Sequence, residues 1–103
     1  MEKCIFCDIV QKNSKTELAL ENDKLVVFKD INPKADYHFL IVPKKHIVSI
    51  ASDGSEDVAR DLILAAKEIA KKYQIVGYKL VFNVGREGGQ LVDHLHLHFL
   101  AGK

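Results

Sequence analysis

The segment that most constrains the fold is Asp93–Leu100, which reads D-H-L-H-L-H-F-L. Its histidines alternate strictly with apolar residues, and this period of two is typical of a β-strand with one buried face. We expect Leu95, Leu97 and Phe99 to enter a core, with the three imidazoles in a row on the opposite face. Neighbouring imidazoles would then lie roughly 6.5–7 Å apart. Such a row can bind a phosphate or hold a metal ion.

The size and charge of the chain limit its class. Its 103 residues suit one compact domain, residues 1–103. The net charge is +1, and the basic tracts do not exceed two adjacent lysines, so a nucleic acid is not an expected partner. The chain shows no signal sequence and no apolar stretch near the ~20 residues of a membrane span. We therefore expect a cytoplasmic protein that does not enter a membrane.

Hydrophobic periodicity and turn residues predict the remaining elements. The long helix has an apolar stripe at helical spacing, and its other face is charged, so it should cover one face of a sheet. Five or six strands with this helix make an α+β domain with a largely antiparallel sheet. The expected elements are a short helix at Cys4–Gln11, a strand hairpin at Glu17–Leu20 and Lys24–Lys29, strands at Tyr37–Val42 and Tyr78–Val84, and the long helix at Glu56–Tyr73.

A glycine-rich loop, Gly85–Gln90, leads directly into the histidine segment. Its glycines let backbone N–H groups approach an anion closely, and Asn83 could add an amide donor. This favours catalysis in which one imidazole attacks a phosphorus atom while its neighbours bind oxygens and supply a proton. Two alternatives stay open: an H-x-H metal site, and a polar strand face exposed to solvent.

Two cysteines, Cys4 and Cys7, form a C-x-x-C pair. In a chain without an export signal, this spacing indicates a metal-binding or redox pair more than a structural disulfide. A tetrahedral zinc ion would need two further ligands.

Several motifs together resemble one family. H-L-H-L-H-F-L fits the histidine triad pattern, and C-I-F-C-D-I-V, F-K-D-I-N-P, H-F-L-I-V-P-K-K-H-I and N-V-G-R-E-G-G-Q resemble its Hint-type branch of nucleotide-binding proteins. The similarity covers nearly the whole chain in the same order. It implies a five-stranded antiparallel sheet with one long and one short helix. It also implies that two subunits pair into a ten-stranded homodimer.

The resemblance implies an activity and its residues. The expected reaction is hydrolysis of purine nucleoside 5′-phosphoramidates to a nucleoside monophosphate and an amine, through a covalent nucleotidyl-histidine and without a catalytic metal. His96 matches the nucleophile, and a histidine in the third triad position favours hydrolysis over transfer to a sugar phosphate. The other histidines of the implied catalytic cluster are His98, His94 and His38. The implied nucleotide-binding residues are Phe28, Asp30, Ile31, Asn83, Gly89 and Gln90, with His96 and His98.

The resemblance also implies a structural zinc ion and leaves some alternatives open. Bacterial-type relatives hold zinc with residues that match Cys4, Cys7, His46 and His94. Many close relatives have serine or threonine where this chain has Leu91, which puts the rate and the preferred leaving group in question. The alternatives are a catalytically weak purine nucleotide-binding or scaffold protein, a dinucleoside polyphosphate hydrolase, and a metalloenzyme that uses the three histidines as ligands.

Overall fold

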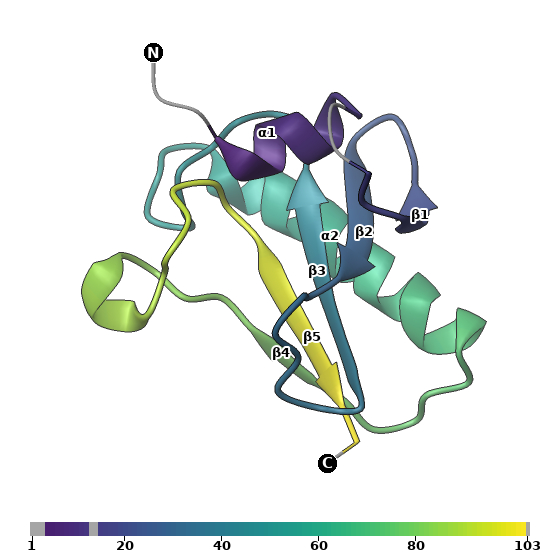
Figure 1. Ribbon diagram of the computed structural model, residues 1–103. Coiled ribbons are helices and arrows are strands. Elements are labelled where there is room, and N and C mark those ends of the chain that lie inside the picture. Colours follow the sequence, from purple (N-terminus) through teal and green to yellow (C-terminus); the bar gives the residue numbers. More distant parts are fainter. Residues whose placement is uncertain (1–3, 13–14, 103) are drawn as a thin grey trace.

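The computed structural model describes residues 4–12 and 15–102 of the chain (Figure 1). This part contains five strands, a short and a long α-helix, and one 3-10 turn, which confirms the expected α+β class. The elements follow in the order α1 (Ile5–Val10), β1 (Leu18–Glu21), β2 (Leu25–Lys29), β3 (Tyr37–Pro43), α2 (Ser55–Lys72), β4 (Lys79–Val81), η1 (Arg86–Gly88) and β5 (Leu97–Ala101).

The five strands form one antiparallel sheet in the order β1-β2-β3-β5-β4. The hairpin of β1 and β2 forms as expected, because the Asn22 side-chain oxygen accepts from the N–H groups of Lys24 (2.8 Å) and Leu25 (3.0 Å). β3 and β5 lie side by side near the centre, with Tyr37 opposite Ala101. This topology brings residues about sixty positions apart in the sequence into contact.

The two helices cover opposite faces of the sheet. α2 runs behind it in Figure 1, and its apolar stripe packs on side chains of β2, β3 and β5 in the larger core. α1 lies across the upper part of the other face, where Phe6 and Ile9 pack with Val26, Phe28 and Leu40. Within residues 4–12 and 15–102, there is no helix of the length and apolarity that crossing a membrane requires.

The histidine segment is a strand only from Leu97 onward, so the expected strand over residues 93–100 is wrong in its first half. The ladder with β3 ends at the pair Ile41–Leu97, and two residues further along β3 the Pro43 carbonyl accepts from the His94 ring at 2.9 Å. The Leu95 N–H donates to the loop that follows β3 (2.6 Å). The alternation of burial nevertheless holds, since Leu95 and Leu97 both enter the larger core.

β4 is also shorter than the expected strand over residues 78–84. Its last residue, Val81, pairs with His98, and the chain then leaves the sheet toward the glycine-rich loop. Gly85 (φ 71°) and Gly89 (φ 91°), which flank the 3-10 turn, have the positive φ angles that favour glycine. The loop therefore begins close to the histidine face.

Candidate active site and metal centre

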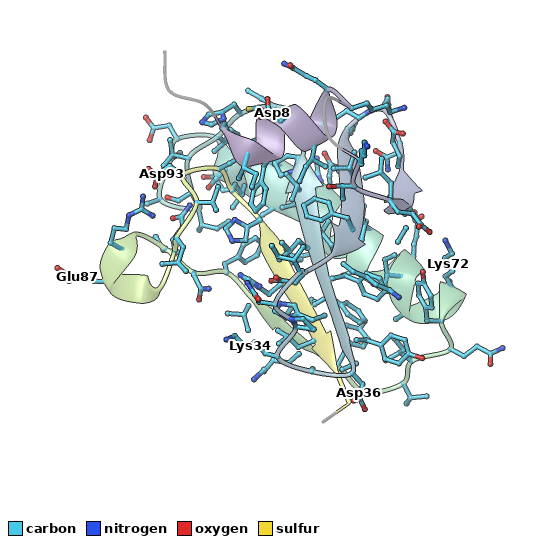
Figure 2. All side chains as sticks on the ribbon, in the orientation of Figure 1. Asp8, Lys34, Asp36, Lys72, Glu87 and Asp93 are labelled. Atoms are coloured by element: carbon cyan, nitrogen blue, oxygen red, sulfur yellow. The ribbon has the colours of Figure 1, made fainter. Side chains whose placement is uncertain are left out.

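Four histidines gather on the face of the sheet opposite α2. His98 lies on β5 opposite Leu40, and its ring centroid is 5.2 Å from that of His38 on β3. The His96 ring lies 4.9 Å from that of His98. His38, His94 and His96 are all buried. In Figure 2, Asp93 lies beyond the upper end of β5, and Lys34 lies near the lower part of the sheet.

The hydrogen bond from His96 fixes its tautomer. Its Nδ1 atom lies 2.7 Å from the backbone oxygen of His94. A carbonyl oxygen only accepts, so Nδ1 carries the proton and Nε2 keeps its lone pair. Burial lowers the pKa of His96, which keeps the ring neutral at neutral pH. A neutral imidazole with one free lone pair is the form that a nucleophile needs.

A second chain of hydrogen bonds fixes the tautomers of His38 and His98. The backbone N–H of Lys34 donates to His38 Nδ1 (3.0 Å), so the proton of the neutral His38 ring is on Nε2. That Nε2–H donates to His98 Nδ1 (2.9 Å), which leaves the proton of His98 on its Nε2. Burial first, and then the neighbouring His96 and His38, lower the pKa of His98 to about 4. The site therefore presents one N–H donor beside one nucleophilic nitrogen.

Asn83 and Gly89 complete this region. The Asn83 amide nitrogen lies 3.4 Å from His98 Nε2, but two donors cannot bond each other. Exchanging the assigned positions of the amide nitrogen and oxygen places the oxygen beside His98, where it can accept from the Nε2–H group. A Cβ atom on Gly89 would lie 3.7 Å from the Asn83 side chain. The loop backbone thus passes close to the open end of the histidine pair.

Asp30 lies beside His38, with its Oδ2 atom 3.4 Å from His38 Nε2. Asp30, His38 and His98 place possible ligand atoms within 4.8 Å of one another. However, His38 Nδ1 accepts from the backbone N–H of Lys34, so the proton of the neutral ring is on Nε2. His38 Nε2 therefore has no lone pair to offer a metal. We therefore interpret this group as a hydrogen-bond network.

The remaining residues implied for nucleotide binding differ in their exposure. Phe28 is buried and packs edge-on against Phe6, with ring centroids 5.8 Å apart, whereas Ile31 is 89% exposed. Gln90 is buried, and its amide is fully occupied. Gln90 accepts from the Gly85 N–H (2.9 Å) and donates to two backbone oxygens, those of Val48 (2.6 Å) and Val92 (2.9 Å). The Gln90 side chain therefore fixes the glycine-rich loop.

Cys4, Cys7, His46 and His94 converge from three separate segments: α1, the loop after β3, and the segment before β5. Their ligand atoms all lie within 4.8 Å of one another, and Cys4 Sγ is 3.3 Å from His94 Nδ1. Cys7 Sγ lies 3.1 Å from His46 Nδ1. Two sulfur and two nitrogen donors in one group suit a tetrahedral zinc ion.

The protonation of this group also fits a metal. His94 donates from Nε2 to the Pro43 oxygen (2.9 Å), which leaves the Nδ1 lone pair facing the two sulfurs. Burial first, and then the neighbouring Cys4, raise the pKa of Cys7 to about 11. A bound cation would have to displace this thiol proton, so binding would become weaker at lower pH.

Sequence reasoning missed three contributors to the site. The Phe6 ring packs nearly perpendicular to the His96 ring, with centroids 5.0 Å apart, and its only signal was its position inside C-I-F-C. Lys34 and Pro43 act through their backbone groups, which no side-chain pattern can reveal.

Comparison with known proteins places this site in a family. The chain matches the family described as "Scavenger mRNA decapping enzyme C-term binding" over residues 3–103. It is 40% identical to Protein HitA of Neisseria gonorrhoeae over 103 residues, which cover 97% of this chain and 96% of HitA. The chain belongs to the histidine triad (HIT) family. Among HIT structures, it is similar to the HIT family hydrolase of Legionella pneumophila (39% identity, TM-score 0.90, covering 98% and 94% of the two chains).

Other HIT structures have the same fold. A histidine triad protein of Clostridium difficile is 39% identical with a TM-score of 0.92, covering all of this chain and 95% of the other. A protein described as a Zn-bound histidine triad family protein, from Mycobacterium smegmatis, is 27% identical with a TM-score of 0.86 and covers 98% and 76%. The five-stranded antiparallel sheet with two helices is therefore the HIT fold.

Proposed function

We propose that this protein is a hydrolase that cleaves purine nucleoside 5′-phosphoramidates through a covalent nucleotidyl-histidine. The observation that carries the proposal is the pair of complementary nitrogens in one site. His96 Nε2 has a lone pair because its Nδ1–H donates to the His94 carbonyl (2.7 Å). His98 Nε2 carries a proton because its Nδ1 accepts from His38 (2.9 Å). The Legionella pneumophila relative is named a hydrolase, which agrees with this chemistry.

In the first half-reaction, His96 Nε2 attacks the α-phosphorus, and the phosphorus–nitrogen bond to the amine breaks. The Nδ1–H group of His96 keeps its hydrogen bond to the His94 carbonyl, so the carbonyl dipole stabilises the positive charge that develops on the His96 ring. The departing amine takes the Nε2 proton of His98, and the proton that water releases in the second half-reaction returns to that nitrogen. In the second half-reaction, water forms the new phosphorus–oxygen bond, the Nε2–phosphorus bond breaks, and the proton released by water restores the site.

The proposed substrate contacts follow the placement of the remaining residues. Asp30 would accept from the ribose hydroxyls, since a carboxylate is an acceptor for two neighbouring O–H groups. Phe28 and the exposed Ile31 would contact the purine. The Gly89 backbone and Asn83 would bind phosphate oxygens beside His98. We further propose a single HIT domain over residues 1–103, a homodimer, and a cytoplasmic location.

The metal centre is proposed to hold a structural zinc ion. Zinc would join α1 to the loop after β3 and to the segment before β5, and it would make no contact with the substrate. The Mycobacterium smegmatis relative is described as Zn-bound, and the two sulfurs and two nitrogens here suit that ion. We expect one zinc per chain by elemental analysis, and loss of that zinc in Cys7→Ser.

The proposal is tested by measuring turnover of adenosine 5′-phosphoramidate with the wild type and His96→Ala, with intact-protein mass recorded during the reaction. We expect turnover only in the wild type, with a transient mass increase of one adenylyl group. Loss of the nucleophile should lower kcat by at least about 10³-fold. The matched control is Lys45→Ala, which removes an exposed side chain outside the site and should keep the turnover of the wild type.

A second candidate function is a purine nucleotide-binding protein with little activity. The observation that favours it is Leu91, a hydrophobic side chain that is 81% exposed directly after the glycine-rich loop. A histidine triad relative from Candida albicans is described as nucleotide-binding (31% identity, TM-score 0.85, covering 94% and 73%). Tight adenosine monophosphate binding without turnover in the wild type would overturn the hydrolase proposal in favour of this function.

A further inference from the structure

We infer that the Cys4–Cys7–His46–His94 site orients the nucleophile His96, so that a metal bound there controls how often the nucleophile is correctly aligned. The catalytic consequence rests on the proposed function, whereas the structural coupling does not. Zinc in this position would act as a positioning device and would remain outside the reaction itself. Two separate contacts carry the inference.

The first contact runs through the backbone of His94. The His94 ring lies in the metal group, with Nδ1 3.3 Å from the Cys4 sulfur and 3.6 Å from the Cys7 sulfur. The carbonyl of the same residue accepts from His96 Nδ1 at 2.7 Å. Any rotation or shift of His94 that follows metal loss therefore moves the acceptor that selects the reactive tautomer of His96. Hydrogen bonds that surround a metal ligand orient rings and fix their tautomers in this way.

The second contact runs through α1. Cys4 precedes this helix and Cys7 lies within it, so a metal bound by both would fix its position. Phe6, between them, is buried, and its ring packs nearly perpendicular to those of His96 and His94, with centroid distances of 5.0 Å and 5.9 Å. A helix of six residues is marginal on its own and needs tertiary contacts to persist. Loss of the metal should therefore loosen the ring that packs against the nucleophile.

Substitution of His46 can weaken the metal site without altering a residue that contacts His96. Its side chain is exposed, its Nδ1 atom is 3.1 Å from the Cys7 sulfur, and its ring is 4.7 Å from that of His94. It belongs to the metal group and reaches His96 only through those neighbours. Replacing His46 therefore changes the metal site while leaving both of the contacts to the nucleophile in place. The adjacent Lys45, which is also exposed, provides a matched control position.

The experiment compares zinc-loaded wild type, chelated wild type, His46→Ala, His46→Cys and Lys45→Ala. The first measurement is ring ¹⁵N NMR of His96, which reports its tautomer without any substrate. We expect one Nδ1–H tautomer in zinc-loaded wild type, Lys45→Ala and His46→Cys, because cysteine restores a fourth ligand. In the chelated wild type and His46→Ala, we expect a mixture of tautomers. The kcat for adenosine 5′-phosphoramidate should fall on the order of 10-fold in these two samples, with little change in KM.

A further variant keeps the test decisive if the zinc-free protein unfolds. Phe6→Leu retains all four metal ligands but removes the aromatic edge, so the zinc-loaded variant should also show mixed tautomers of His96. The inference would be overturned if His96 kept a single tautomer both in folded protein without the metal and in Phe6→Leu. Mixed tautomers in a protein whose wild type never turns over phosphoramidate would uphold the coupling and refute the proposed function instead.

Discussion

His38 Nε2 lies 2.9 Å from His98 Nδ1, and this contact joins the two central strands through side chains as well as through their ladder. The direction of the bond is set outside the pair, by the backbone N–H of Lys34, which donates to His38 Nδ1. A backbone amide thus determines, through two rings, that His98 offers a proton on Nε2. The tautomer of the proposed proton donor depends on the loop between β2 and β3.

The first prediction concerns His38. His38→Ala removes the donor to His98 Nδ1, so the ring of His98 can adopt either tautomer, and we expect kcat to fall on the order of 10- to 100-fold. His38→Gln should retain more activity, because its amide N–H can replace Nε2–H. Both are measured as turnover of adenosine 5′-phosphoramidate. Equal losses in the two variants would argue against a role for the hydrogen-bond direction.

The second prediction concerns pH and stability. Burial lowers the pKa values of His38, His94, His96 and His98 below the 6.5 expected in the unfolded chain, to about 4 for His98. Between these values the unfolded state binds more protons than the folded state, so stability increases with pH. We therefore expect full stability above pH 6.5 and a progressive loss as the pH falls toward about 4. Urea unfolding at pH 5 and pH 7.5 measures this difference.

The variant His98→Asn provides the control for the pH prediction. It lacks the histidine whose pKa is lowered to about 4, so its unfolding midpoint should change less between the two pH values. Turnover of the wild type should also fall on the acidic side as His96 becomes protonated. A midpoint that responds to pH equally in wild type and His98→Asn would contradict the assigned burial effect.

Much of the fold followed from local patterns in the sequence. The alternation that buries Leu95, Leu97 and Phe99 predicted which side of the histidine segment faces the core. The Asn22 turn predicted the first hairpin, since that residue's side chain bonds the next backbone N–H groups by itself. Such features need no knowledge of the rest of the chain.

The parts that the sequence could not predict depend on contacts between distant segments. The ladder of β5 with β3 ends two residues before Pro43, whose carbonyl accepts from the ring of His94, fifty-one positions away. The role of Phe6 beside His96 is likewise visible only once α1 lies on the sheet. Periodicity describes one segment at a time and so cannot show where a neighbouring strand stops supplying partners.

The third prediction concerns Gln90, which is buried and makes three hydrogen bonds to backbone groups of the surrounding loops. Gln90→Leu preserves volume but leaves these groups without partners, so we expect a loss of about 2–3 kcal/mol in the free energy of unfolding. The glycine-rich loop should also become less ordered, which would raise KM for the nucleotide. Urea unfolding and steady-state kinetics measure the two effects. Glu87→Gln, on the exposed turn of the same loop, is the control and should change neither.

The fourth prediction concerns Leu91 and the leaving group. The side chain is 81% exposed and lines a surface cavity with Ile5, Val48 and Val92, so Leu91→Ser should change stability by no more than about 0.5 kcal/mol. A serine hydroxyl could hydrogen-bond a phosphate oxygen or the departing amine, which leucine cannot. We therefore expect Leu91→Ser to raise kcat for adenosine 5′-phosphoramidate.

The comparison that isolates this effect uses two substrates, adenosine 5′-phosphoramidate and an analogue whose amine carries an apolar group. Loss of the exposed leucine removes apolar contact, so the variant should lose part of any preference for the apolar analogue, by a few-fold in the ratio of kcat/KM values. Leu91→Ala removes the same apolar surface without adding a hydroxyl. If Leu91→Ala raises turnover of the simple phosphoramidate as much as Leu91→Ser does, the hydroxyl is not the cause, and steric access to the site is. If neither variant changes the ratio, Leu91 does not contact the leaving group.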